Sequence, residues 1–352
     1  MRTLSTFSFF LLLGLFIACN RDTDDTSATP YTIDLPMNFP QFEIPEDNPM
    51  TAEGVKLGKK LFYEKQLSGD NSQSCGSCHQ PAFAFSDTGA VSTGIDGISG
   101  NRSSMPIVNA LWGNNFFWDG RAKSLEDQAL GPVVNPIEMH ETWPNAVEKI
   151  QNDAQYPPLF IKAFGTETVD SILIAKAIAQ FERTLISGNS KFDKYLRGEV
   201  NLTAAEFAGL DMFNIEGPID GNPNGADCFH CHGFPLGTDN LFHNNGIDKE
   251  EDWTDLGLYE ITQNPMDKAK FKTPTLRNIA FSAPYMHDGR FKTLEEVIDF
   301  YNTGGHTSST LDPLMKNPET GLLLTEDAKA NLLAFLHTLS DTTFITNPAF
   351  QE

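Results

Sequence analysis

The sequence predicts a mainly α-helical protein of two domains with long loops, and three observations support this. A cysteine pair followed by a histidine occurs twice, as C-G-S-C-H at residues 75–79 and C-F-H-C-H at residues 228–232. Apolar residues recur at helical spacing along much of the chain, whereas no run alternates as a strand would. Loops rich in Gly and Pro follow each motif.

The C-x-x-C-H pattern is the attachment motif of a c-type haem. A C-x-x-C pair alone is also compatible with a zinc or redox site, but a histidine after the second cysteine in both copies favours haem. Each predicted domain is therefore a c-type cytochrome domain around one covalently bound haem c. The predicted attachment cysteines and iron-ligating histidines are Cys75, Cys78 and His79 in the first domain and Cys228, Cys231 and His232 in the second.

The clearest helix is predicted for residues 168–187. Its apolar residues fall at i, i+4, i+7 and i+11, which places them on one face. These residues are Ile174, Ile178, Phe181 and Leu185.

Three further helices carry start signals. Thr203 with Glu206 and Thr293 with Glu296 each form a capping box. The helix that starts at Thr293 is expected to stop at a Gly-Gly pair. Thr325, followed by two acidic residues, predicts the start of the last long helix.

The N-terminus predicts export. Arg2 precedes the apolar run FSFFLLLGLFIAC, which is too short for a mature membrane span and resembles a lipoprotein cleavage site. Cleavage before Cys19 and acylation of its sulfur would anchor the protein to a membrane; simple secretion is the alternative. Covalent haem attachment places the protein on the periplasmic side of a bacterial membrane. The predicted divisions are a signal peptide at 1–18, a lipid-anchored polar linker at 19–48, a first haem domain at 49–200 and a second at 201–345.

The chain is acidic, with 47 Asp and Glu against 25 Lys and Arg and a net charge of −22. This balance argues against a nucleic-acid partner. It favours a basic protein partner, although solubility alone is an equal explanation. Contact with a membrane is expected only through the lipid anchor.

The second haem iron has several candidate sixth ligands. Met286, Tyr301, Met315 and His243 follow the second motif, and His230 is part of it. His230 lies inside the C-x-x-C loop and is expected to point away from the iron. The helix that starts at Thr293 directs Tyr301 inward. A tyrosine at such a core position is usually hydrogen-bonded to another part of the protein and does not bind a metal.

Polar residues suited to catalysis gather between the motifs, in residues 114–139. Glu138 is flanked by Ile137 and Met139, and apolar surroundings raise the pKa of a carboxyl towards neutrality, as proton transfer requires. A solvent-facing Glu138 is the alternative. Trp118 and Gln128 lie in the same stretch.

The stretches "CGSCH", "NNFFWDGRAKSLEDQALGPVVNPIEM", "CFHCH", "FKTPTLRNIAFSAPYMHDGRFKTLEEV" and "FYNTGG" together resemble the bacterial di-haem cytochrome c peroxidase family. That family includes the di-haem enzyme that matures the tryptophan-derived cofactor of methylamine dehydrogenase. The resemblance covers nearly all of the chain from residue 49 to residue 339.

The resemblance implies roles for individual residues. The first haem, held by His79, would be peroxidatic, and the second, held by His232, would transfer electrons. Trp118 would relay electrons between them. Gln128 would orient peroxide, and Glu138 would move a proton between the peroxide oxygens.

The resemblance also implies calcium between the domains. The matching positions are Ser103, Ser282 and Pro284, of which Ser103 replaces the usual asparagine. Family members are often dimers, so a homodimer is expected by analogy.

Two departures from the commonest peroxidases stand out. Where they carry a histidine that blocks the peroxidatic iron, this chain has Ile95, which cannot ligate iron. The first haem is therefore expected to be open to peroxide without reductive activation. Where they carry an axial methionine at the second haem, this chain has Tyr301, as the cofactor-maturing enzyme does; Met286 stays the alternative.

The leading functional hypothesis is reduction of hydrogen peroxide to water, with electrons from a small periplasmic cytochrome c or copper protein. The second is peroxide-driven oxidation of residues on a partner protein. The third is a non-catalytic electron carrier, against which the pairing of Ile95 with Glu138 and Gln128 counts.

Overall fold

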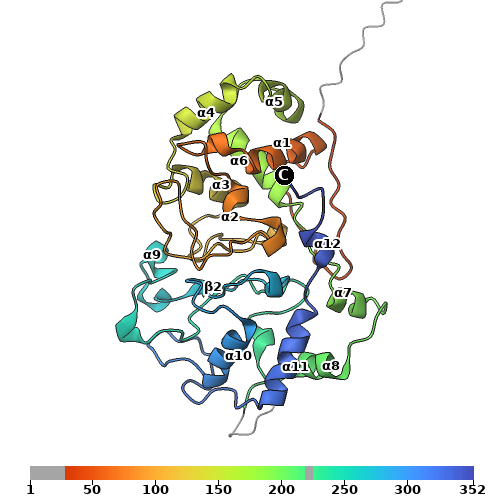
Figure 1. Cartoon of the computed structure of the whole chain (residues 1–352), viewed down its shortest axis with the longest axis vertical. Coiled ribbons are helices and arrows are strands. Elements are labelled where there is room, and N and C mark those ends of the chain that lie inside the picture. Colours follow the sequence, from red (N-terminus) through yellow and green to blue (C-terminus); the bar gives the residue numbers. More distant parts are fainter. Residues whose placement is uncertain (1–27, 219–224) are drawn as a thin grey trace, which may run out of the picture.

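The computed structural model describes residues 28–218 and 225–352, which form two helical lobes (Figure 1). The predicted signal peptide and Cys19 lie outside the described residues. The first lobe contains α1 (Ala52–Phe62), α2 (Cys75–Cys78), α3 (Leu125–Val134), α4 (Trp143–Asn152), α5 (Pro157–Phe164) and α6 (Ser171–Glu182). Next come α7 (Lys191–Leu196), α8 (Ala204–Phe213), α9 (Tyr259–Thr262), α10 (Leu294–Thr303), α11 (Glu326–His337) and α12 (Thr342–Ile345).

The sheet content of the described residues is small. Strands β1 (Phe242–His243) and β2 (Phe271–Lys272) pair in antiparallel fashion, with Phe242 opposite Lys272. They lie on the side of the second lobe that faces the first (Figure 1). The mainly helical fold predicted from the sequence is confirmed.

The core of the first lobe forms around α6, which packs against α1 and α3. Ile174, Ile178 and Phe181 are buried, as the helical stripe predicts. The helix ends at Glu182, so Leu185 lies beyond it, although it is buried in the same core. Helices α1 and α6 approach closely at Gly58, where a Cβ would come within 1.8 Å of the Ala177 carbonyl oxygen.

The second lobe packs α11 against α8 and α10. The capping boxes predicted at Thr203 and Thr293 are both present, and Thr325 caps α11. α10 ends at Gly304 in a left-handed conformation with φ of 92°, which glycine adopts without strain.

Contacts at several places tie the lobes together. After α11 the chain returns to the first lobe, where Phe344 and Phe350 join the core around α6 (Figure 1). At the junction itself, Arg277 of the second lobe binds Asp193 of α7 through two hydrogen bonds of 2.9 Å. The domain boundaries proposed from the sequence stay a prediction.

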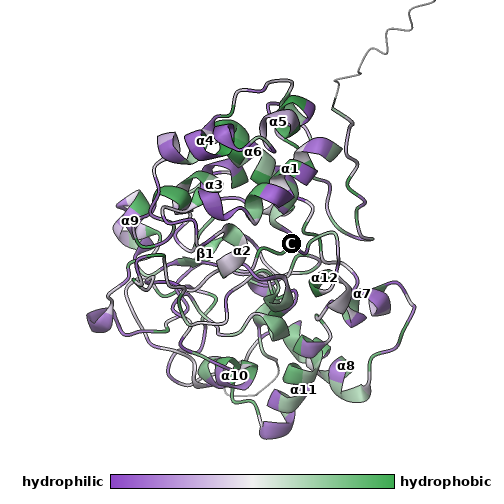
Figure 2. Cartoon of the chain, turned by 45° about the horizontal axis from the view of Figure 1, so that its top comes forward, coloured by the Kyte–Doolittle hydropathy of each residue, from purple (hydrophilic) through white to green (hydrophobic). Residues whose placement is uncertain are grey.

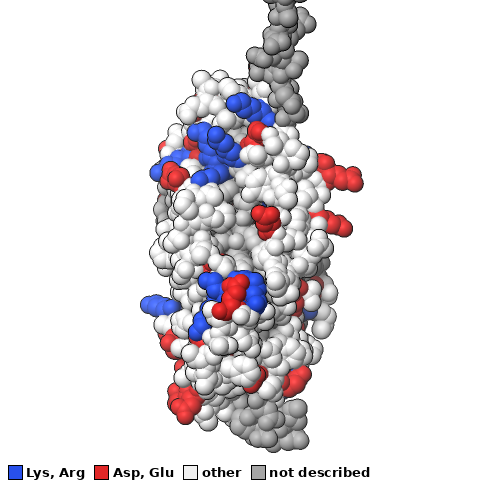
Figure 3. All heavy atoms as spheres, turned by 90° about the vertical axis from the view of Figure 1, so that its right-hand side faces the viewer, with Lys and Arg blue, Asp and Glu red and all other residues white. Residues whose placement is uncertain are grey.

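The helices are amphipathic, with hydrophilic residues on their outer faces and apolar residues on their inner faces (Figure 2). On the face shown in Figure 3, Lys and Arg side chains gather over the first lobe and near the middle, and acidic side chains are scattered. The net negative charge is therefore not concentrated on this face. Among the described residues, no helix has the length and apolar character needed to cross a membrane.

Candidate functional site

The first C-x-x-C-H motif opens onto a cavity of about 280 Å³, here called cavity 1. Cys75 and Cys78 lie on α2, and His79 caps the end of this helix. The predicted catalytic residues Gln128, Glu138 and Trp118 line the same cavity, together with both cysteines and His79. The structure therefore brings together side chains from three separate segments of the chain.

His79 is held in the orientation that an iron ligand requires. Its Nδ1 lies 2.8 Å from the Phe85 carbonyl oxygen, to which it donates, so Nε2 keeps its lone pair for a metal. Ala84 and Phe85 adopt φ values of 55° and 58°, and this turn directs the carbonyl back towards the imidazole. Burial lowers the pKa of His79, although the Phe85 carbonyl opposes the effect, so the ring is neutral as a ligand must be.

Glu138 lies on the turn after α3, half-buried in cavity 1. Burial raises the pKa of its carboxyl, and the Asn135 hydrogen bond and the Arg121 charge only partly oppose the shift. Asn135 Nδ2 donates to Oε1 at 2.6 Å, and this is its one hydrogen bond to a side chain in the described part of the protein. Oε2 is therefore the oxygen available to carry a proton.

Gln128 reaches cavity 1 from α3. Ser124 caps this helix by accepting from the Asp127 amide, and Leu125 and Ala129 are buried. Gln128, one turn into the helix, is thus carried on a rigid element beside Leu125 at the cavity wall.

Ile95 lies in a loop that is bound to the Glu138 turn. Its amide donates to the Glu138 carbonyl oxygen at 3.0 Å, and its Cδ1 lies close to Gly69. Among the described residues that line cavity 1, His79 supplies the only imidazole and there is no tyrosine; Met105 and Met139 are the thioethers.

The second motif opens onto cavity 2, of about 240 Å³. Cys228, Cys231 and His232 all line it. His232 Nδ1 lies 3.1 Å from the Gly237 carbonyl oxygen, and burial lowers the pKa of the ring. The arrangement matches that of His79, so the donor sets of both cavities fit a covalently attached haem.

Four of the five candidate sixth ligands line cavity 2: Met286, Tyr301, Met315 and His243. His230 instead lies against Glu216 and Asp227, 3.1 Å from an oxygen of each. The outward direction expected for His230 agrees with this pairing.

Tyr301 and Met286 share one neighbour in cavity 2. Asn245 Nδ2 donates to the Tyr301 hydroxyl at 3.3 Å and lies 3.9 Å from Met286 Sδ. Tyr301 is on the α10 face that also buries Leu294 and Ile298, as the helical spacing predicts. Burial raises the pKa of its hydroxyl to about 12.

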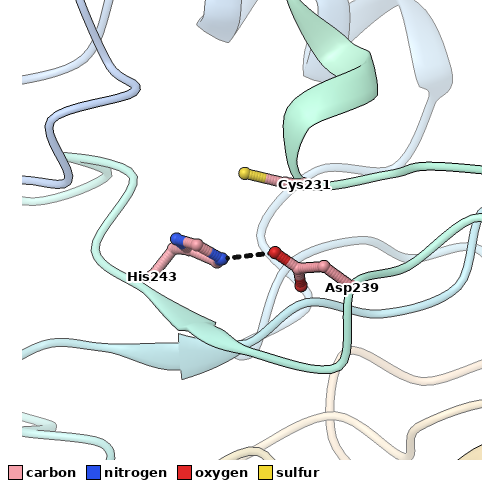
Figure 4. A group of neighbouring side chains, drawn as sticks. All are labelled: Cys231, Asp239 and His243. Atoms are coloured by element: carbon pink, nitrogen blue, oxygen red, sulfur yellow. Dashed lines mark hydrogen bonds and ion pairs between the residues drawn. The ribbon is translucent and has the colours of Figure 1, made fainter.

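Both ring nitrogens of His243 are hydrogen-bonded to carboxylates, which makes His243 a poor candidate for an iron ligand. Its Nε2 lies 2.8 Å from Asp239 and its Nδ1 lies 2.6 Å from Asp312. The Asp239 hydrogen bond is the largest of the influences that raise the pKa of His243 to about 11, so both nitrogens carry protons. Figure 4 shows Cys231 beside the hydrogen-bonded pair of His243 and Asp239. Cys231, Asp239 and His243 could together hold a metal ion, but attachment of haem as a thioether would occupy the Cys231 sulfur. We therefore interpret His243 and its carboxylates as charged groups that influence the electrostatic potential in cavity 2.

Trp118 lies between the cavities and lines both of them. Its indole Nε1 donates to the Ser103 carbonyl oxygen at 2.9 Å, and its own carbonyl accepts from the Lys272 amide at 2.9 Å. The side chain is 8% exposed. This position is the one that an electron relay between two haems would need.

Sequence reasoning missed Arg102, which fixes the surroundings of Trp118. It binds Asp119, the next residue after Trp118, and forms two hydrogen bonds of 2.7 Å with Asp255 of the second lobe. Because Asp255 is 153 positions away in the chain, no local pattern points to this pair. Glu182, which also lines cavity 1, was missed as well.

The residues implied for calcium lie near one another. Ser103 Oγ donates to the Met286 carbonyl oxygen at 2.9 Å, which places Ser103 against the loop that carries Ser282 and Pro284. Ser103 and Ser282 are both buried. Calcium binding stays a prediction.

The sixth ligand of the second haem can be assigned by two substitutions. Tyr301→Phe removes the phenol oxygen and is expected to change the absorption spectrum of the second haem alone, with a rise in its reduction potential, because a phenolate stabilises oxidised iron. Met286→Leu is expected to leave the spectrum unchanged. Tyr285→Phe is the matched control, since the Tyr285 hydroxyl donates to the Ile279 carbonyl oxygen at 3.0 Å. The reverse pattern would assign Met286.

Comparison with known proteins agrees with this geometry. Residues 52–201 match the family described as di-haem cytochrome c peroxidase. Cytochrome-c peroxidase IdrP1 of Pseudomonas sp. (strain SCT) is 33% identical over 94% of this chain and 92% of the relative. Methylamine utilization protein MauG of Methylorubrum extorquens is 36% identical over 84% of this chain and 80% of the relative. The crystal structure of a MauG-like protein associated with microbial copper homeostasis superposes with a TM-score of 0.82 and 36% identity, over 91% of this chain and 99% of that one.

Proposed function

Because the chain belongs to the di-haem cytochrome c peroxidase family and is a haem peroxidase, we propose that it reduces hydrogen peroxide to water in cavity 1. One observation carries this proposal. Gln128 and Glu138 line the cavity onto which the first C-x-x-C-H motif opens, while Trp118 lines both cavities. A non-catalytic electron carrier has no use for an amide and a carboxyl in that place.

The family implies a haem c in each cavity. Cys75 and Cys78 would attach the first and His79 would ligate its iron; Cys228, Cys231 and His232 would hold the second. When bound, haem supplies an iron centre that accepts peroxide and exchanges electrons singly.

The residues of cavity 1 supply binding and proton transfer. The Gln128 amide donates a hydrogen bond that orients peroxide. Glu138 takes the proton from the inner peroxide oxygen at Oε2 and returns it to the outer oxygen, which leaves as water. Two electrons and two further protons per peroxide complete the reduction, and the electrons arrive one at a time from a small cytochrome c or copper protein.

We further propose that cavity 1 is open to peroxide in the resting oxidised protein. Supporting this, Ile95 packs towards Gly69 and has no atom that can ligate iron. The test is peroxide turnover by the as-isolated oxidised protein, with reduced small cytochromes or organic dyes as donors, beside its low-temperature paramagnetic resonance spectrum. A high-spin signal and prompt reaction with peroxide are expected. A wholly low-spin spectrum with no reaction until the second haem is reduced would contradict the proposal.

Oxidation of a partner protein is the second candidate, favoured by Tyr301 in cavity 2 and by the likeness to MauG. The same assay separates the two functions. A peroxidase consumes peroxide continuously with a small carrier. A protein-modifying enzyme consumes little until its partner is added.

Export stays part of the proposal. We propose that the mature chain is on the periplasmic side of a bacterial membrane and that a lipid at Cys19 anchors it. Support comes from the sequence of the leader and from the covalent haem motifs, whose attachment takes place outside the cytoplasm.

A further inference from the structure

A second carboxyl group lines cavity 1, and no catalytic role above uses it. Glu182 is the last residue of α6, and its side chain is only 3% exposed. It lines the cavity together with Cys75 and with Ile178, which lies one helical turn earlier.

One oxygen of the Glu182 carboxyl receives no hydrogen bond from the described residues around it. Within residues 28–218 and 225–352, its Oε2 has no hydrogen-bond partner. The neighbouring Arg183 is directed instead to Glu126, at 2.7 Å. Glu126 is also held by Asn48, whose Nδ2 donates at 2.6 Å. Because buried polar atoms nearly always have a partner, the partner of Glu182 is expected inside the cavity, as water or the bound group.

Glu182 differs in this respect from Glu138, which Asn135 holds. Burial raises the pKa of Glu182 to about 8; the Arg183 charge opposes the shift and the Glu126 charge adds to it. A buried carboxyl without a partner is stable only in its neutral form. Without a positive charge beside it, Glu182 therefore holds a proton at neutral pH; it lies next to the attachment point of the first haem.

We propose that Glu182 is the proton site coupled to electron uptake by the first haem. The inference rests on the proposed binding of haem in cavity 1. The positive charge of the oxidised haem would favour the Glu182 carboxylate. An electron from the carrier lowers that charge by one unit, and a proton from solvent then neutralises the carboxylate. On oxidation, by peroxide in turnover or by a chemical oxidant in a titration, the electron leaves the haem and the proton returns to solvent. The total charge inside the cavity is thereby kept constant, which a buried site favours.

Other groups near Glu182 titrate or carry charge. The side chains that face it or line the same cavity are Arg183, Glu126, Glu138, Arg102, Arg121 and Lys272. The arginines keep their charge at every relevant pH. Glu138 and Lys272 are therefore the groups to control for, because burial also lowers the pKa of Lys272 to about 8. Lys272 lines both cavities, whereas Glu182 lines cavity 1 alone.

The test is a potentiometric titration of the haem-loaded protein, without peroxide, at a series of pH values around the pKa of Glu182. In the unmodified protein the potential of the first haem is expected to fall as pH rises, by at most about 59 mV per tenfold change in proton concentration. Glu182→Gln is expected to abolish the slope at the first haem. Glu138→Gln and Lys272→Met are expected to keep it. An unchanged slope in Glu182→Gln overturns the proposal.

A second measurement covers the case in which Glu182→Gln does not take up haem. In infrared difference spectra, reduction of the unmodified protein is expected to produce a protonated-carboxyl band, which Glu182→Asp should shift in frequency. An unshifted band, or no band, overturns the proposal. Both measurements omit peroxide, so they remain informative if the proposed peroxidase function fails.

Discussion

Glu138→Gln is expected to slow peroxide reduction by at least about a hundredfold, because proton transfer by a positioned side chain contributes about 10²–10⁴ to a rate. The amide keeps the size and polarity of Glu138 but cannot take up a proton. The pKa of Glu138 is raised by burial, so the carboxyl holds a proton more readily than a solvent-facing glutamate does. Stopped-flow mixing of the oxidised protein with peroxide measures the effect directly.

Two controls separate proton transfer from general damage to cavity 1. Glu148→Gln makes the same chemical change on the exposed face of α4 and should leave the rate unchanged. The absorption spectrum of oxidised Glu138→Gln should match that of the unmodified protein, which shows that the haem surroundings are intact. A normal rate in Glu138→Gln would remove the carboxyl from the mechanism.

Asp193→Ala is expected to destabilise the protein by about 3–5 kcal/mol, because it leaves the Arg277 charge buried without its partner. The two side chains are 6% and 2% exposed, so water cannot replace the carboxylate. The measurement is urea unfolding followed by tryptophan fluorescence. Asp211→Ala, on an exposed position of α8, should change the free energy of unfolding by no more than about 0.5 kcal/mol.

A double substitution tests the stated cause. If the unpaired Arg277 charge is responsible for the loss, Asp193→Leu combined with Arg277→Met should recover most of it, since apolar pairs often replace buried ion pairs at little cost. A double variant that is as unstable as Asp193→Ala would assign the loss to the capping hydrogen bonds between Asp193 and Ser190.

Local patterns predicted the haem motifs, the caps and the main helix stripe, because these depend on residues close in sequence. Phe207 shows what such local patterns do not reveal. It follows the capping box of α8 as an apolar residue, yet it is 46% exposed. The helix packs instead through Gly209, where a Cβ would come within 2.0 Å of the Asn331 carbonyl oxygen on α11. A close approach between helices more than a hundred positions apart leaves no periodic signal.

Glu182 and His243 show the same limit at the site. A Glu-Arg pair at a helix end usually faces solvent, whereas Glu182 is buried at the end of a helix that packs against α1 and α3. From the sequence alone, His243 remains a candidate iron ligand, because its second carboxylate partner cannot be recognised. That carboxylate belongs to Asp312, which is 69 positions along the chain.

The returning C-terminal segment has a consequence for the order in which the molecule can mature. The rings of Phe344 and Phe350 lie 5.7 Å and 6.4 Å from that of Phe85, whose carbonyl aligns His79. The orientation of the predicted first iron ligand thus depends on residues that follow the whole second lobe in the chain. Although N-terminal domains usually finish folding first, the core of this one is complete only after the chain has passed through the second lobe and returned.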